Sequence, residues 1–298
     1  MTQNKCCRHG ASLRRRRRRR RKILRSIIFS CSIIAVAVFV AVGSRMITSG
    51  DGRKNRYDVE AGNNTYDNAV IENSKISEKN KIQNNQSMLD DIMNSTQYPK
   101  QLKDLALKNE EALEFVYDYP AEHVKEHTID LTEEVSMDSV PLFVQWDKRW
   151  GYEKYSGNFF AASGCGPTTL SMVVVYLTHD REASPIAVAK YSKEAGYSVD
   201  GSGSSWTLIS EGCRHYGVKA KAVALDESRM KAELDEGHPI VVNVGPGDFT
   251  DTGHFMVITG YDDEGFSIND PNSIEKSGKR WLFKNISSQI RAVWSMYV

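Results

Sequence analysis

Cysteine is scarce in this sequence. The 298 residues include five cysteines at no repeated spacing, and only Cys165 and Cys213 lie beyond residue 45. A small disulfide-stabilised scaffold needs more cysteines in a regular pattern, so that class of protein is excluded. The two later cysteines are therefore either one bridge, or one special thiol and one buried side chain.

Motifs for nucleotides and metals are absent from the sequence as well. It has no P-loop pattern, no dinucleotide-binding glycine pattern, and no cluster of Cys, His, Asp and Glu with the spacing of metal ligands. We therefore expect no cofactor and no metal site.

Most of the chain also lacks an excess of positive charge. The formal net charge is +1, but residues 1–25 carry twelve Lys and Arg and no acid, including the run Arg14–Arg21. Residues 26–298 hold 27 basic and 38 acidic side chains. Binding to phosphates needs a basic face, so we expect no nucleic-acid partner for this part. An arginine run can serve as a nucleic-acid tail, but the segment that follows it here indicates another role.

That segment, residues 26–44, contains no charged side chain and is rich in Ile, Val, Ala and Phe. About 20 apolar residues cross a bilayer as a helix, so the sequence predicts one transmembrane anchor here. The positive-inside rule makes residues 1–25 a basic cytoplasmic tail and places the rest of this single-pass chain outside the cell membrane. A signal peptide cleaved after Ala41-Val42-Gly43 is the alternative, although the apolar stretch is longer than usual for one.

The part beyond the anchor falls into three regions. Residues 45–97 are polar, with few large apolar side chains, and predict a flexible stalk. Residues 98–137 carry apolar side chains at helical spacing between Pro99 and Pro120, which predicts a helical lead-in that packs on the main domain. Residues 138–298 complete the chain as one compact domain.

Within 138–298, helical patterns precede β-rich runs, which predicts an α+β fold whose helical part is followed by an antiparallel sheet. The extended run that opens the domain is 140–144. The expected helices are 167–177, 185–195, 206–216 and 227–236. The expected strands are 240–244, 254–261, 266–269 and 290–297.

Cys165 is the first candidate for chemistry. Gly164 and Gly166 flank it and allow a sharp turn with close backbone access, and Pro167 suits the first turn of a helix. A thiol at a helix N-terminus has its pKa lowered from about 8.5, which favours the nucleophilic thiolate. A small buried cysteine at a helix start is the alternative interpretation.

His254 and Asp270 are the candidate partners of this thiol. His254 heads an apolar strand, the turn 262–265 follows, and a returning strand brings Asn269 and Asp270 back toward His254. A carboxylate there holds the second imidazole nitrogen and fixes the tautomer. Asn269 stays open as an alternative to Asp270, because the sequence does not fix the strand register.

These segments, in this order, resemble the C39-like peptidases, a branch of the papain-like cysteine peptidases. The matching pieces are Val140-Pro141, Gln145, Trp150-Gly151, Ser163-Gly164-Cys165-Gly166-Pro167-Thr168, Gly201-Ser202-Gly203-Ser204-Ser205-Trp206, Gly237-His238-Pro239-Ile240, Gly253-His254-Phe255 and Asn269-Asp270-Pro271. The resemblance implies a papain-like fold over 138–298. It also implies Cys165 as nucleophile, His254 as general base and acid, and Asp270 as orienting residue.

Further site residues follow from the same resemblance. In papain-like enzymes a glutamine completes the oxyanion hole, which suggests Gln145, although it lies farther before the cysteine than in the exporter-type pattern and is otherwise a strand-end residue. The segment with Gly203, Ser205 and Trp206 either lines the substrate cleft or caps the next helix, and Gly253 adjoins the candidate base. The expected function is a membrane-anchored extracellular cysteine peptidase acting on peptides or proteins. The alternatives are a non-catalytic peptide-binding domain, with Cys165 bridged to Cys213, and an amidase acting on cell-wall peptides.

Overall fold

The computed structural model describes residues 64–298, with side chains from residue 77 onward. The predicted basic tail 1–25, the predicted anchor 26–44 and the first part of the predicted stalk lie outside the described residues. Among residues 64–298, no helix combines the length and the apolar character that a membrane crossing requires.

The second part of the predicted stalk is a helix. Helix α2, Asn64–Asn94, is largely polar, but Met88, Leu89 and Ile92 near its C-terminal end pack against the segment that follows, and Ile92 is fully buried. This short apolar stripe anchors the C-terminal end of the helix. The prediction of a flexible stalk over 45–97 is therefore wrong for this part, because it rested on average composition.

The lead-in is helical, but it is a series of short helices and not the single helix that its spacing suggested. The chain turns out of the helical conformation at Asn109, where φ is −136° and ψ is 99°. Its apolar side chains form a cluster with Phe159 and Ala161 of the main domain. The elements are α3 Lys100–Lys108, the 3₁₀ helix η1 Glu110–Ala112, α4 Leu113–Tyr117, α5 Tyr119–Glu122 and α6 Thr132–Ser136.

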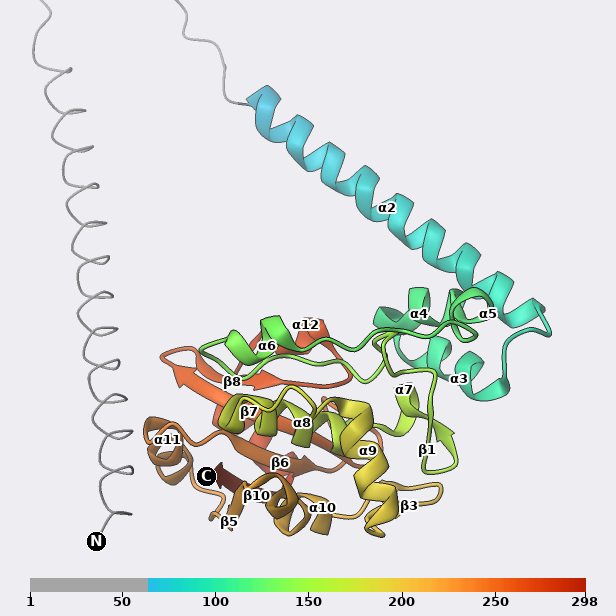
Figure 1. Cartoon of the computed structure of the whole chain (residues 1–298). Helices are drawn as coiled ribbons and strands as arrows, with labels where there is room; N and C mark the ends of the chain where they lie inside the picture. The colour runs from blue at the N-terminus through green and yellow to red at the C-terminus, as the bar shows by residue number, and fades with distance from the viewer. Residues whose placement is uncertain (1–63) are drawn as a thin grey trace, which may run out of the picture. The chain divides into compact units, whose positions relative to one another are not determined.

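A six-stranded antiparallel sheet forms the centre of the main domain (Figure 1), as the sequence predicts. In spatial order its strands are β5 Lys219–Ala222, β10 Ile290–Tyr297, β6 Ile240–Val244, β7 His254–Asp262, β8 Gly265–Asn269 and β9 Arg280–Trp281. Two small antiparallel pairs lie apart from it: β1 Lys154–Tyr155 with β2 Asn158–Phe159, and β3 Ser198–Val199 with β4 Gly203–Ser204. The four expected strands are present, whereas the edge strands β5 and β9 were not predicted.

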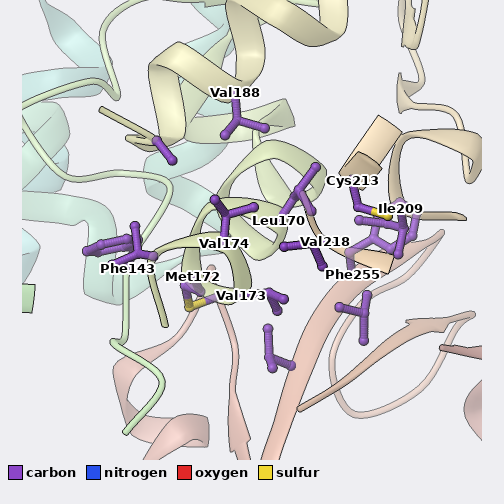
Figure 2. Close-up of a cluster of buried hydrophobic side chains, with 14 of the residues drawn as sticks. Phe143, Leu170, Met172, Val173, Val174, Val188, Ile209, Cys213, Val218 and Phe255 are labelled. Carbon is purple, nitrogen blue, oxygen red and sulfur yellow. The ribbon is translucent and has the colours of Figure 1, made fainter. Parts of the chain in front are cut away.

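Alternate residues of the central strands face two separate cores. On one side Val241, Phe255 and Val257 meet the buried helix α8, whose residues Leu170, Val173 and Val174 are fully buried (Figure 2). The helices that contribute to this core are α6, α7 Phe160–Ser163, α8 Cys165–Thr178, α9 Pro185–Glu194, α10 Thr207–Ser210 and the 3₁₀ helix η2 Gly212–Tyr216. The other core contains side chains from α11 Glu227–Asp235 and α13 Phe283–Ile286; α12 Ile274–Ser277 and η3 Ser287–Gln289 complete the fold.

Two local predictions differ from the structure. Residues 140–144 do not pair as a strand, and the carbonyl oxygens of Val140 and Pro141 instead accept from the side-chain amide of Asn269, at 3.1 and 2.9 Å. The expected helix 206–216 is split between α10 and η2. At the split Gly212 packs within 3.0 Å of the Tyr197 ring, measured from the position that a β-carbon would take.

Candidate active site

Helix α8 presents Cys165 as its first residue. A β-carbon on Gly164 would lie 2.6 Å from the Phe160 ring, and one on Gly166 would lie 2.5 Å from the Ser204 hydroxyl. Both glycines are therefore needed for steric reasons, since the backbone around Cys165 is pressed against its neighbours. The backbone N–H groups of Cys165 and Gly166 belong to the first turn and have no carbonyl acceptor within the helix.

The thiol of Cys165 meets the imidazole of His254. Each side chain shifts the pKa of the other through its hydrogen-bonding group and its charge, and the backbone N–H groups of Phe255 and Gly166 also lower the pKa of the Cys165 thiol. Cys165 is half-buried and His254 is 6% exposed, so the contact is largely shielded from water. A thiol and an imidazole in this relation have the chemistry that a nucleophile and its base require.

Asp270 holds the other side of the imidazole. Nε2 of His254 donates to Oδ1 of Asp270 at 2.7 Å, and the Asp270 side chain is fully buried. Since Nε2 is used in this way, Nδ1 is the nitrogen that faces the sulfur. The carboxylate therefore fixes both the tautomer and the orientation of the ring.

A bulge in the β7–β8 hairpin decides which side chain reaches His254. Val257 pairs with Asn269 and Ile258 with Ile268, after a register shift between Ile258 and Gly260. Continued by one residue, this register places Asp270 on the face of β7 that His254 occupies, because alternate residues share a face. Asn269 points elsewhere and bonds the backbone of 140–141. Of the two candidates for orienting His254, the structure thus brings Asp270 and not Asn269 into contact with the ring.

The charges of the three groups shift one another's protonation. Burial raises the pKa of the Cys165 thiol, but the hydrogen bond and positive charge of His254 outweigh it, so that the pKa lies below the ordinary value. Burial alone would lower the pKa of His254, yet the Asp270 carboxylate and the Cys165 sulfur raise it to about 10. The arrangement therefore favours a thiolate paired with an imidazolium.

Gln145 lies beside this pair and is almost fully buried. Its Nε2 donates to the backbone oxygen of Ala161 at 2.7 Å, and its backbone N–H donates to the oxygen of Pro271 at 2.7 Å. An amide nitrogen carries two hydrogens, so one N–H of Nε2 is left over on a side chain that lines the cleft. The alternative of an ordinary strand-end residue does not fit, since 140–144 is not a strand.

A cleft of about 520 Å³ opens at Cys165 and His254. Of the four residues predicted to bind substrate, Gly253 lines it, whereas Gly203, Ser205 and Trp206 do not. Gly203 has φ +84° and packs behind the start of α8, near the Ser163 carbonyl. Ser205 hydrogen-bonds Thr207 at the start of α10, although the N-cap of that helix is Trp206 and it has no side-chain cap, and the Trp206 ring meets Trp294 edge-on. The prediction that this segment lines the cleft is wrong for the cleft beside Cys165.

Other residues of the cleft wall were missed in the sequence. One wall comes from the lead-in, another from the β6–β7 connection, and Asn272 and Lys276 lie near the Asp270 turn. The lead-in contributes Gln101, Asp104, Leu105, Lys108 and Asn109, and the connection contributes residues 247–253. No spacing in the sequence marks these residues, because they meet Cys165 only through tertiary packing.

Cys213 is a buried core residue. It is fully buried within the cluster between α8 and the sheet, and burial raises the pKa of its thiol to about 11 (Figure 2). Cys165 and Cys213 are both free, so the bridged form of the binding-domain alternative is wrong for this structure. The inert interpretation of Cys213 agrees with its surroundings.

Comparisons with known proteins complete the description of this site. No curated protein sequence matches the chain. Among solved structures it is similar to the peptidase domain of Streptococcus ComA, a bifunctional ABC transporter of a quorum-sensing pathway, at 18% identity and a TM-score of 0.39, covering 53% of this chain and 96% of that one. It is also similar to a protein from Bacillus anthracis described as a C39-like peptidase, at 18% identity and a TM-score of 0.34, covering 53% and 95%.

The family comparison covers the whole main domain. The model of the Peptidase_C39 like family matches residues 137–298, more than half of the chain, and this range contains Cys165, His254 and Asp270. The chain belongs to the Peptidase_C39 like family.

Proposed function

We propose that this protein is a cysteine peptidase whose nucleophile is Cys165, whose general base and acid is His254 and whose orienting residue is Asp270. The observation that carries the proposal is the 2.7 Å bond from His254 Nε2 to the buried Asp270, with the other ring nitrogen facing the Cys165 sulfur. The family is one of peptidases, and the cleft at the sulfur supports access by a peptide.

The proposed reaction is transfer of an acyl group from an amide to water. The Cys165 thiolate attacks the carbonyl carbon, and the backbone N–H of Cys165 with an N–H of Gln145 stabilises the oxyanion. Nδ1 of His254 protonates the leaving amine, which leaves a thioester on Cys165. Water then attacks the thioester while Nδ1 accepts its proton, and the carboxylic acid departs from the regenerated thiolate.

We also propose that the domain works outside the cell, held at the membrane by residues 26–44. The support is the charge-free apolar run next to twelve basic residues. Selective labelling of intact cells with a membrane-impermeant amine reagent tests this: lysines of 138–298 should be labelled before those of 1–25.

The activity itself is tested with the purified full chain. Denatured protein and isolated cell walls are incubated in parallel, so that cleavage of main-chain peptide bonds and of cell-wall peptides are scored separately. Cys213→Ala is the matched control, since it removes the other free thiol of the domain. Hydrolysis of neither substrate by a folded protein with a reactive Cys165 would instead support a binding domain.

The pH profile of kcat/KM is expected to be bell-shaped, with the acid limb below the ordinary thiol pKa and the alkaline limb above the ordinary imidazole pKa. Activity rises where Cys165 deprotonates, which lies below the ordinary thiol pKa, because the thiolate is the attacking form. It falls as the pH passes about 10, the pKa of His254, because the imidazolium that protonates the amine is then lost. Initial rates across the pH range in which the chain stays folded measure both limbs. An acid limb at an ordinary thiol pKa would contradict the ion pair.

Removal of the Gln145 amide is expected to slow turnover. Gln145→Ala should lower kcat on the order of 10²–10³-fold, the loss typical of one oxyanion-hole donor. KM should change less, because the donor acts on charge that develops in the transition state. Steady-state kinetics with Asn158→Ala, another residue of the cleft wall, as the comparison separates an oxyanion role from a general effect on the cleft. Equal losses in kcat for the two variants would count against that role.

A further inference from the structure

The turn after β8 determines where the Asp270 carboxylate lies. The backbone N–H of Asn272 donates to Oδ1 of Asp270 at 2.8 Å, the same oxygen that accepts from His254. The backbone N–H of Ser273 donates to the backbone oxygen of Asp270 at 3.2 Å and closes the turn. A shift of residues 272–273 would therefore move the carboxylate that orients the imidazole.

Neighbours within the family domain hold this turn at a few points. The backbone N–H of Gln145 bonds the oxygen of Pro271 at 2.7 Å, and the indole of Trp146 reaches the oxygen of Asn272 at 3.3 Å. The Ser277 hydroxyl accepts from the backbone N–H of Asp270 at 2.9 Å. The Ser273 hydroxyl accepts the backbone N–H of Lys276 at 3.0 Å as the N-cap of α12, whereas none of these contacts engages the side chain of Asn272.

Asn109, at the break between α3 and η1, engages the side chain of Asn272. Its Nδ2 donates to the backbone oxygen of Asn272 at 2.9 Å and to the side-chain oxygen of Asn272 at 3.1 Å. Its own Oδ1 accepts the backbone N–H of Glu111 at 3.0 Å, which fixes the amide in this orientation. The extended backbone at Asn109, which ends α3, thus points the side chain at the turn.

Glu111, on η1, engages the side chain of Ser273 and the start of α12. One carboxylate oxygen accepts the backbone N–H of Ile274 at 2.7 Å and that of Glu275 at 3.1 Å, and the other accepts the Ser273 hydroxyl. A carboxylate that accepts several N–H and O–H groups makes strong, charge-assisted hydrogen bonds. The turn is therefore clamped on its outer side by a segment about 160 residues earlier in the chain.

We infer that Asn109 and Glu111 are positioning residues for the catalytic site: by fixing residues 272–275 they place Asp270 and, through it, the imidazole of His254. The contacts form one connected path, from Glu111 through Ser273 and Asn272 to Asp270 and His254. The inference rests on the proposed function and extends it, because both residues precede the region 137–298 that defines the family.

Alkylation of Cys165 by iodoacetamide, measured against pH on the full chain, tests the inference without relying on peptide turnover. The titratable groups that interact with the His254 ring are Asp270 and Cys165. A displaced Asp270 therefore lowers the pKa of His254, and the loss of positive charge on the ring raises the pKa of Cys165. The midpoint of alkylation should rise by about one pH unit in Glu111→Ala and in Asn109→Ala, which means about tenfold less thiolate at a given pH. Mass spectrometry of the peptide that carries Cys165 gives the rate.

Two further variants separate position from charge. Glu110→Gln removes a carboxylate from the same turn, but Glu110 bonds Asn85 of α2, so the midpoint should stay at the wild-type value. Glu111→Gln keeps an acceptor for the N–H groups of α12, so its midpoint should stay close to the wild-type value. Thermal unfolding identifies the temperature at which every variant is folded, and Asn109→Ala carries the test if Glu111→Ala does not fold.

The outcomes distinguish the inference from the proposed function. A depressed midpoint in the wild type that stays the same in Glu111→Ala and Asn109→Ala overturns the positioning role alone. An equal shift in Glu111→Gln and Glu111→Ala, with none in Asn109→Ala, also overturns it, because charge and not position would then be the cause. A wild-type midpoint at the ordinary thiol value overturns the ion pair and the proposed function together.

Discussion

Cys165→Ala is expected to abolish hydrolysis, with kcat lower on the order of 10⁶-fold, the loss typical of removing the nucleophile from a hydrolase triad. The reason is geometric. The Cys165 sulfur is the group that both opens into the cleft and contacts His254, and alanine leaves the imidazole with no nucleophile to activate. Substrate binding should survive, because the walls of the cleft come from other elements.

The comparison that makes this result decisive uses the second free cysteine. Cys213→Ala removes a thiol of the same kind from the core and should leave kcat near the wild-type value. Loss of the buried sulfur lowers the free energy of unfolding by about 1 kcal/mol, which unfolding experiments detect. Residual hydrolysis by Cys165→Ala at the rate of Cys213→Ala would refute the role of Cys165.

Asp270→Ala is expected to lower kcat on the order of 10⁴-fold, as for knocking out the triad aspartate of a serine hydrolase. Without Asp270 the imidazole of His254 loses the bond that fixes its tautomer, and Nδ1 no longer faces the sulfur in a defined state. The buried ring is also left without its partner, which costs about 1–3 kcal/mol of stability. Kinetics must therefore be measured below the unfolding temperature of the variant.

Asp270→Asn separates orientation from charge. Its side-chain oxygen can still accept from His254 Nε2 and from the Asn272 N–H, so the tautomer is kept while the negative charge is lost. The loss in kcat should be smaller, about 10- to 100-fold, since a change of one pKa unit is tenfold in protonation. The alkaline limb should move to lower pH, because the carboxylate is what raises the pKa of His254. Equal losses for alanine and asparagine would show that Asp270 acts through its charge alone.

The sequence was informative where chemistry is local. The glycines and proline around Cys165 predicted a thiol at a helix start, and α8 begins at that residue. The pattern from His254 to Asp270 predicted a hairpin that returns to its own beginning, and β7 and β8 form it. In both cases the segments involved are close together in the chain, so the periodicity and turn residues contain the information.

The register of the β7–β8 hairpin could not be predicted from the sequence. Counted back from the pairing of Asp262 with Gly265, a regular hairpin would pair Ile258 with Asn269, which is one residue away from the register observed. A slip of one residue moves every side chain to the other face, and Asp270 would then have turned away from His254. The bulge that prevents this has no clear signal in the sequence.

Most residues that line the cleft could not be predicted from the sequence either. Asn109 and Glu111 meet residues 272–275 through packing of the whole lead-in, and nothing in their spacing relates them to Asp270. For the segment with Gly203 and Trp206, the sequence instead predicted a place in the cleft wall that the structure does not give it. Its polar, glycine-rich character is typical of a binding loop, yet it packs behind α8, where Gly166 needs room.

The shared apolar cluster of α2, the lead-in and the main domain bears on where a working unit of this protein begins. A fragment cut at residue 137, the family boundary, would uncover Phe159 and Ala161 and lose the Asn109 and Glu111 clamp. Even a cut just before Pro99 would remove Ile92 and its neighbours from the cluster. Family boundaries describe what relatives have in common, whereas the stable module here starts near the last turns of α2.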